Sequence, residues 1–184
     1  MPSDTTLHDR RTIKRHVVEG IVEADETYIG GKEKNKHADK RKKNNQGRST
    51  KTKTPIKIQV ERDGRARAKT LTDIRMRTLQ ENIEKNVSPD SDIMTDEWRS
   101  YRGLDRKFKS HSIVEHNKGQ CVRGNSYTNT AESWIALLKR GVIGTFHHVS
   151  EKHLDRYVNE FAFRCDNRKT TDGDQFVNTL KKGD

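Results

Sequence analysis

The sequence predicts an α/β fold in which a mixed β-sheet is flanked by helices. Two observations support this class. Segments rich in Val, Ile and Thr and bounded by Gly or Pro recur in the first two thirds of the chain, which is typical of strands. Other segments repeat apolar residues at intervals of three and four positions, which is typical of helices with one buried face. Elements mixed in this way form layered domains in which helices cover a sheet.

Three strands are expected in the first part of the chain. Residues 17–29 are rich in Val, Ile and Thr and end at a pair of glycines, which indicates a strand closed by a turn. Pro55 precedes a second strand over 56–61, and an Asp-Gly turn leads into a third over 65–71. The second and third strands should therefore form a hairpin.

A helix follows the hairpin, because Thr72 can cap a segment in which Met76, Leu79, Ile83 and Val87 share one face.

Shorter elements complete the predicted sheet. Residues 92–95 form a short apolar strand, residues 97–102 resemble the first turns of a helix, and residues 112–115 predict a fifth strand. Helices are expected at 129–140 and 151–165, where apolar side chains align on one face. The order strand, strand, strand, helix, strand, helix, strand, helix is typical of a ribonuclease H-like fold.

Apolar residues are unevenly distributed along the chain. Leu, Ile, Val and Phe make up about 19% of the 184 residues, which is close to the level at which disorder becomes common. The shortage is concentrated at the two ends and in one internal stretch. We therefore expect a folded domain over 17–169, a flexible N-terminal segment over 1–16, a flexible insert over 32–53 and a C-terminal tail over 170–184.

The insert also carries most of the net charge of +11, since ten Lys or Arg residues and two acidic residues lie in 32–53. A patch of this density attracts a polyanion through counterion release, although a solvated linker is an equally acceptable interpretation. Because the insert has no aromatic residues, it could contact nucleic-acid backbones but could hardly read their sequence. The candidate DNA-binding residues here are Lys40, Arg41, Lys42, Lys43 and Arg48.

The cysteines and the hydropathy pattern exclude several other classes of protein. Cys121 and Cys165 lie far apart with no CxxC motif, so the sequence indicates neither a disulfide framework nor a zinc ribbon. The N-terminus is polar rather than signal-like, and no apolar run approaches the roughly 20 residues of a membrane span. We expect a soluble, cytoplasmic, nucleoid-associated protein with no membrane partner.

Three carboxylates stand where this fold could bring them together. Asp25 lies in the first strand, Asp96 follows the fourth strand and Glu132 lies on a helix. Three converging acids would bind hard divalent cations, which prefer oxygen ligands and bridge phosphate oxygens. Each acid also has an ordinary explanation: Asp25 as a solvated strand residue, Asp96 as a helix N-cap, and Glu132 in a capping box with Asn129.

The helix of Glu132 carries a candidate basic partner for this site. Glu132, Ala136 and Lys139 fall on one side of the helix, although a surface ion pair would explain this spacing equally well. In a two-metal site, Asp25 would bridge both ions, Asp96 and Glu132 would each hold one, and Lys139 would neutralise a phosphate.

Other charged residues receive simpler interpretations. His147 and His148 are adjacent and point apart, so we do not expect them to form a zinc site with His153. Glu160 and Arg164 have the spacing of an ion pair within one helix, which we favour over a role in contacting DNA. Phosphate contacts are expected from Arg140 and Arg168.

The chain resembles the catalytic domain of ISXO-like insertion-sequence DDE transposases over residues 17–169. The resemblance rests on the blocks DETYIGG, VERDGRARAKTL, TDEWRSYRGL, HSIVEHNKGQCVRGNSYTNTAES, LLKRGVIGTFHHVSEKHLDRYVNEFAFR and DNRK. Glu132 lies 36 positions after Asp96, and this spacing is also typical of such enzymes. The resemblance implies an enzyme that cuts and joins DNA, with Asp25, Asp96 and Glu132 as metal-binding triad and Lys139 as the associated basic residue.

The expected activity is therefore Mg²⁺-dependent DNA cleavage and strand transfer, with two ions per site and Mn²⁺ as a possible substitute. The expected partners are element ends, target DNA and further copies of the chain. Two alternatives stay open. Only sixteen residues precede the first predicted strand, so the protein could be a truncated, catalytically inactive DNA-binding remnant. It could also be a structure-specific nuclease on the same fold.

Overall fold

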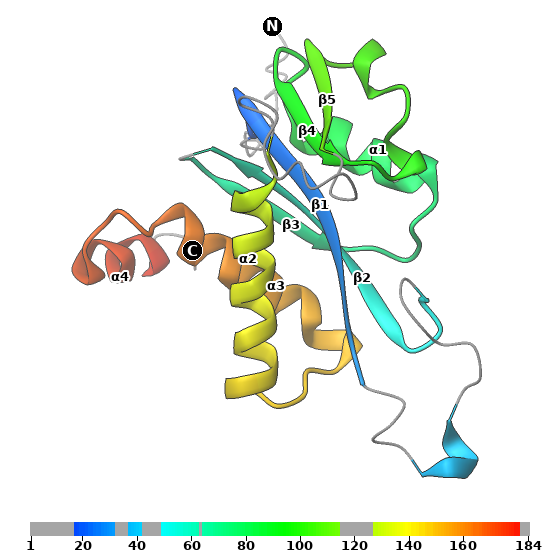
Figure 1. The fold of residues 1–184 in the computed structure, drawn as a ribbon. Helices are drawn as coiled ribbons and strands as arrows, with labels where there is room; N and C mark the ends of the chain where they lie inside the picture. The colour runs from blue at the N-terminus through cyan, green and yellow to red at the C-terminus, as the bar shows by residue number, and fades with distance from the viewer. Residues whose placement is uncertain (1–16, 32–36, 42–48, 63, 115–126, 181–184) are drawn as a thin grey trace, which may run out of the picture.

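The fold was analysed in a computed structural model that describes residues 17–31, 37–41, 49–62, 64–114 and 127–180, without the side chains of residues 178 and 179. Five strands form one sheet in the order β3-β2-β1-β4-β5 (Figure 1). The strands are β1 (Ile21–Gly30), β2 (Lys53–Glu61), β3 (Ala66–Thr70), β4 (Asp92–Asp96) and β5 (Ser110–Val114). The predicted fold class, a ribonuclease H-like mixed sheet flanked by helices, is confirmed.

The pairing directions of the strands make the sheet mixed. β2 pairs antiparallel with both β1 and β3, which confirms the predicted hairpin, whereas β4 pairs parallel with both β1 and β5. The pairing of β1 with β4 covers only Ile21–Glu23, although β1 is 10 residues long. The C-terminal end of β4 therefore lies beside the middle of β1, and the rest of β1 continues alongside β2 alone.

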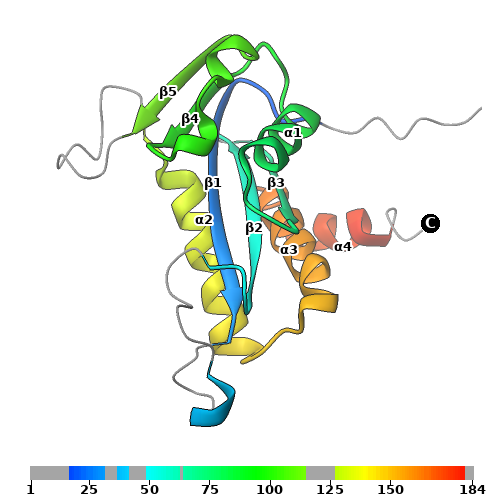
Figure 2. The same ribbon diagram turned by 90° about the vertical axis from the view of Figure 1, so that its right-hand side faces the viewer.

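Helices cover both faces of the sheet. The helices are α1 (Met76–Asn86), α2 (Asn129–Arg140), the π-helical turn η6 (Gly141–Thr145), α3 (Glu151–Asp166) and α4 (Asp172–Leu180), with short 3-10 turns η2 (Ala38–Lys40), η3 (Arg99–Tyr101) and η4 (Leu104–Arg106). In both views α2 runs along β1, and α4 extends away from the sheet beyond the end of α3 (Figures 1 and 2).

The apolar side chains form two clusters, one on each face of the sheet. The larger joins β1, β2 and β3 to α2 and α3, and the smaller joins β1 and β4 to α1, η3 and η4. Ile56, Ile58 and Val60 of β2 belong to the larger cluster, as the period-two rule requires. Lys57 and Gln59 point to the opposite face, where they are buried as well. Both faces of β2 are thus covered.

Several element boundaries differ from those expected from the sequence. The first strand begins at Ile21 rather than 17, although Val18 still forms a bridge to Val87. The first helix begins at Met76, where Arg75 is the N-cap residue in place of Thr72.

Two of the shorter predicted elements also shift. Residues 97–102 form only the 3-10 turn η3, because Asp96 Oδ1 accepts a hydrogen bond from Trp98 N and Trp98 has an extended backbone. The fifth strand lies at Ser110–Val114 rather than 112–115, and residue 115 is outside the described residues.

The segments expected to be flexible are only partly described. Within 32–53 the structure describes the turn η2 and the beginning of β2 at Lys53, whereas residues 1–16 lie outside the described residues. The expected tail over 170–184 contains α4. Among the residues that the structure describes, no helix is both long and apolar enough to cross a lipid bilayer.

Candidate metal centre

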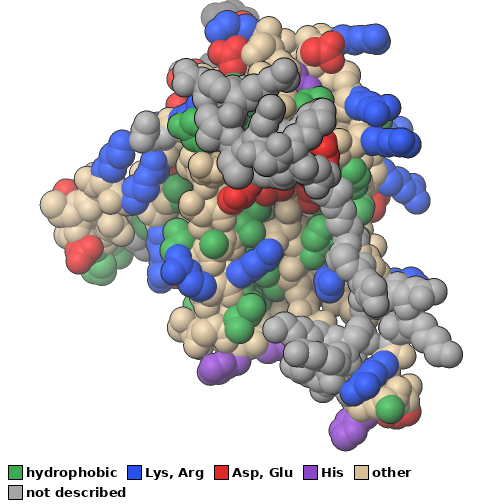
Figure 3. Space-filling model, viewed as in Figure 1, with side chains coloured by type: hydrophobic (Ala, Val, Ile, Leu, Met, Phe, Trp, Pro, Cys, Tyr) green, Lys and Arg blue, Asp and Glu red, His purple; other side chains and the backbone are tan. Residues whose placement is uncertain are grey.

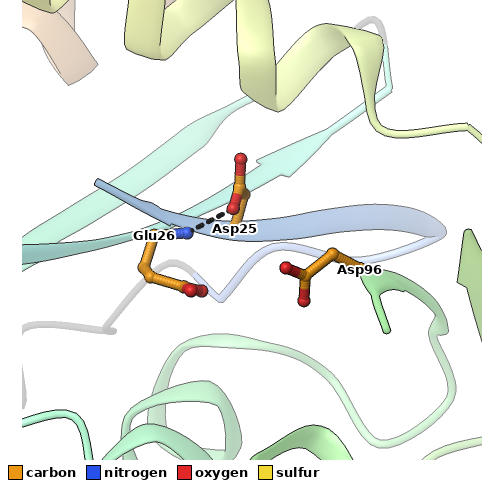
Figure 4. Close-up of side chains that lie close together, drawn as sticks. All are labelled: Asp25, Glu26 and Asp96. Atoms are coloured by element: carbon orange, nitrogen blue, oxygen red, sulfur yellow. Dashed lines mark hydrogen bonds between the residues drawn. The ribbon is translucent and has the colours of Figure 1, made fainter. Parts of the chain in front are cut away.

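Three carboxylates from two neighbouring strands meet at the C-terminal end of β4. Asp25, Glu26 and Asp96 each offer an oxygen atom, and these atoms all lie within 4.8 Å of one another. Figure 4 shows Asp25 and Glu26 leaving β1 in different directions, with Asp96 facing them from the end of β4. A donor set made only of carboxylate oxygens fits a hard divalent cation such as Mg²⁺.

The strand register explains why Asp25 and Asp96 come together. Glu23 pairs with Met94 in the parallel ladder, and two residues further along each strand lie Asp25 and Asp96. Asp25 is opposite Ile58 of β2, whose side chain belongs to the cluster beneath α2 and α3. Asp25 therefore shares the sheet face on which α2 packs. The expectation that these two acids converge agrees with this geometry.

Glu132 lies on the first turn of α2 with an exposed side chain. Its carboxylate accepts a hydrogen bond of 3.1 Å from the hydroxyl of Thr128, which is the N-cap residue of α2, the position that the capping-box interpretation gave to Asn129. Glu132 does not belong to the group of three close carboxylates. It is still near enough for its charge to contribute to raising the pKa of Asp25.

Burial controls the ionisation of the two carboxyl groups on β1. Desolvation raises the pKa of Asp25, and the charges of Asp96 and Glu132 raise it further, whereas Lys57 and the backbone N–H of Glu26 oppose the change. Desolvation also raises the pKa of Glu26 against the opposing effects of Lys57 and Tyr101. Ionised carboxylates are thus costly here, which favours a bound cation.

A buried polar network lies beneath the acidic cluster. Lys57 pairs with Glu26 across the β1–β2 ladder, and its side chain is completely buried. The ammonium donates to the hydroxyl of Tyr101 in η3, and that hydroxyl donates to Glu26 Oε2. Sequence reasoning missed all three residues. Only Glu26 gave a usable signal, as an acid next to Asp25, because nothing local indicates that Lys57 and Tyr101 meet.

The candidate phosphate-binding residues lie at several places. Lys139 and Arg140 are exposed in the last turn of α2, and Lys139 shares an exposed side of that helix with Glu132 and Ala136. Figure 3 shows acidic side chains gathered on this face of the molecule, with Lys and Arg side chains at several points around them. Arg168 donates to the backbone oxygens of Gly64 and Cys165.

The basic insert is described only in part. Lys40 ends η2 and Arg41 follows it, and both side chains are exposed. The candidate residues Lys42, Lys43 and Arg48 lie outside the described residues.

Arg164 and Glu160 form the expected ion pair within α3, with Nη2 and Oε1 2.6 Å apart. In the described part of the chain, His147, His148 and His153 do not belong to a group of metal-binding side chains.

The sheet order and the acids at the end of β4 define a ribonuclease H-like domain with a candidate cation-binding centre. The chain belongs to the family of ISXO2-like transposase domains, because residues 17–166 match the sequence model of that family. It is also similar to an uncharacterized transposase-like protein of Haemophilus influenzae, with 27% identity over 111 residues. The aligned region covers 60% of this chain and 89% of that protein. The predicted family is confirmed, and membership gives the chain a role as a transposase of mobile DNA.

Proposed function

We propose that this domain cleaves DNA at the ends of an insertion sequence and joins the freed 3′-hydroxyl to target DNA. The observation that carries the proposal is the convergence of Asp25 and Asp96 at one end of β4, on the sheet face covered by the helix of Glu132. Transposase family membership supports DNA as the substrate. The proposed catalytic domain is residues 17–169, and the proposed metal is Mg²⁺, replaceable by Mn²⁺.

Each acid has a proposed role that follows from its position. Asp25 lies close to Asp96 and also responds to the charge of Glu132, so it is the carboxylate best placed to be shared by two ions. Asp96 would hold one ion and Glu132 the other. Two such ions supply activation of the attacking hydroxyl and stabilisation of the leaving oxygen. The protein contributes the fixed positions of the oxygen ligands.

The basic residues are proposed to contact DNA phosphates. Lys139 and Arg140 lie on α2 with Glu132, so a strand placed against the acidic centre could continue along this helix. Lys40 and Arg41, together with Lys42, Lys43 and Arg48, would add contacts from the insert. Arg168 binds the backbone at the end of α3, and its exposed guanidinium could also contact a phosphate. We propose that copies of the chain assemble on paired DNA ends.

The proposal is tested with purified protein and DNA that carries the ends of its source element. Wild type should nick and join this DNA only when Mg²⁺ or Mn²⁺ is present. Asp25→Asn, Asp96→Asn and Glu132→Gln should each remove both products. Glu160→Gln is the matched control, because it neutralises a partly exposed acid whose ion pair with Arg164 lies within α3.

Three outcomes would contradict the proposal: no product with any divalent metal, unchanged products with Asp25→Asn, or equal activity in a chelator. Cleavage of branched or hybrid substrates without joining would instead indicate a structure-specific nuclease.

A further inference from the structure

Glu23 is a completely buried acid that the metal centre does not use directly. It lies on β1 two residues before Asp25, so both side chains are on the same face of the sheet. One carboxylate oxygen of Glu23 accepts the backbone N–H groups of Thr130, at 2.7 Å, and Ala131, at 3.1 Å. The other accepts the hydroxyl of Thr130, at 3.1 Å, and Nε of Arg62, at 2.9 Å. Every one of these donors comes from another part of the chain.

The contacts made by Glu23 replace an ordinary helix cap. The first N–H groups of a helix have no partner within the helix, and a side chain just before it usually accepts one of them. In α2 the side chain of the N-cap residue Thr128 makes no capping bond and donates to Glu132 instead. The carboxylate of Glu23 therefore caps α2 from the strand that carries Asp25, and its charge suits the positive end of the helix dipole.

Arg62 completes the connection between the sheet and the helix. Besides its bond to Glu23, it donates from Nη2 to the backbone oxygen of Tyr127, at 3.1 Å, and its guanidinium lies 3.5 Å from the centre of the Tyr127 ring. The side chain of Arg62 is only 13% exposed, so the pair with Glu23 is largely shielded from water. Arg62 thus neutralises a buried acid and also fixes the residue that precedes Thr128.

We propose that Glu23 and Arg62 form a clamp that positions Glu132 against Asp25 and thereby sets the metal affinity of the centre. The inference rests on the proposed function, in which Glu132 is a metal ligand. Glu132 is two residues from Thr130 in the same helical turn, and Asp25 is two residues from Glu23 on the same strand. A change in the contact between Glu23 and Thr130 therefore changes the separation of the two ligands. Glu23 and Arg62 are positioning residues.

Mn²⁺ affinity, measured by isothermal titration calorimetry on the full chain, tests this role. Glu23→Gln places an amide N–H₂ where a carboxylate oxygen accepts two donors, so it should misplace α2. Residues that orient metal ligands typically change metal affinity by 10- to 100-fold, and we expect a loss of about tenfold or more. In a Glu132→Gln background the same change should cause no further loss, because the ligand being positioned is already gone.

Two further variants separate positioning from general stability. Arg62→Gln should weaken Mn²⁺ binding in the same direction and likewise only while Glu132 is present. Asp166→Asn is the matched control. Like Glu23, Asp166 accepts hydrogen bonds from a backbone N–H, that of Ala66 at 2.7 Å, and from an arginine, Arg67 at 3.1 Å. These bonds hold α3 to β3 and involve no residue of α2. Asp166→Asn should lower the unfolding temperature and leave Mn²⁺ affinity unchanged. Circular dichroism confirms that each variant is folded at the titration temperature.

The possible results distinguish the inference from the proposed function. If Glu132→Gln weakens Mn²⁺ binding but Glu23→Gln and Arg62→Gln do not, the clamp is only structural and the inference is wrong. The inference is also wrong if the losses from Glu23→Gln and Glu132→Gln add in full. If Glu132→Gln itself leaves the affinity unchanged, Glu132 is not a ligand, and the proposed function and the inference both fail.

Discussion

Replacing Lys57 by Met should change how the stability of the protein depends on pH. Lys57 is completely buried, and desolvation lowers the pKa of its ammonium from 10.5 to about 8, against the opposing charges of Glu26, Asp25 and Asp96. The unfolded chain returns this side chain to water. The folded state therefore binds the proton on Lys57 more weakly than the unfolded state does.

The size of the effect follows from the two pKa values. A change from 10.5 to about 8 corresponds to about 3 kcal/mol in the free energy of unfolding. At about pH 7 both states are protonated and the whole cost is present. Between about pH 8 and 10.5 the unfolded state holds more protons, so the contribution of Lys57 to stability improves as the pH rises. Met has a similar length and does not titrate, so Lys57→Met lacks this contribution.

The assay is urea unfolding in a chelator, followed by circular dichroism at several values between about pH 7 and 10. The free energy of unfolding of wild type minus that of Lys57→Met should rise by about 2–3 kcal/mol across this range. Titrating groups that do not interact with Lys57 are the same in both proteins, so their contributions cancel in this difference. Lys152→Met is the matched control, because Lys152 is exposed on α3 and its difference from wild type should stay constant. A constant difference for Lys57→Met as well would refute the reasoning.

Three further predictions concern α2 and α3. Leu138→Ala should lower the free energy of unfolding by about 2–5 kcal/mol in urea titrations, because the Leu138 side chain is completely buried. The control Leu137→Ala should cost well under about 1 kcal/mol, because Leu137 is 51% exposed. Equal costs for the two variants would contradict the packing of α2. Arg164→Ala should lower the free energy of unfolding by no more than about 0.5 kcal/mol in the same assay, because its ion pair with Glu160 is exposed. A larger loss of stability would show that Arg164 has a structural role. Lys139→Ala should reduce the slope of log DNA affinity against log salt by about 0.9 in fluorescence anisotropy titrations, and an unchanged slope would mean that Lys139 neutralises no phosphate.

The sequence was sufficient to predict the sheet, its hairpin and the meeting of Asp25 with Asp96. These features depend on local patterns: period-two alternation, turn residues, and acids placed in or just after a strand. A different pattern, the recurrence of apolar residues at intervals of three and four positions, located α2 and α3. The helix boundaries were less accurate, because Thr72 is a suitable cap by composition but the helix begins only at Met76. Residue preference alone does not select among several polar residues at a helix start.

The polar groups beneath the site could not be predicted in the same way. In the alternation Ile56, Lys57, Ile58, the lysine occupies the position expected to face water. It is buried because α1 and η3 cover that face, and Tyr101 reaches it from 44 residues further along the chain. Glu23 likewise resembles a solvated strand residue, and its partner Thr130 lies 107 residues away. Such contacts come from the tertiary arrangement and leave no periodic signal.

The charges around the centre explain why this end of β4 suits a cation. Glu23 is matched by Arg62 and by the free N–H groups of α2, so it adds little negative charge to the site. Lys57 supplies one buried positive charge that acts on Glu26, Asp25 and Asp96 together. One ammonium cannot neutralise three ionised carboxylates, and burial already raises the pKa of two of them. Among the described residues this cluster therefore keeps an excess of negative charge when it is ionised, and a divalent cation is the simplest group that would offset it.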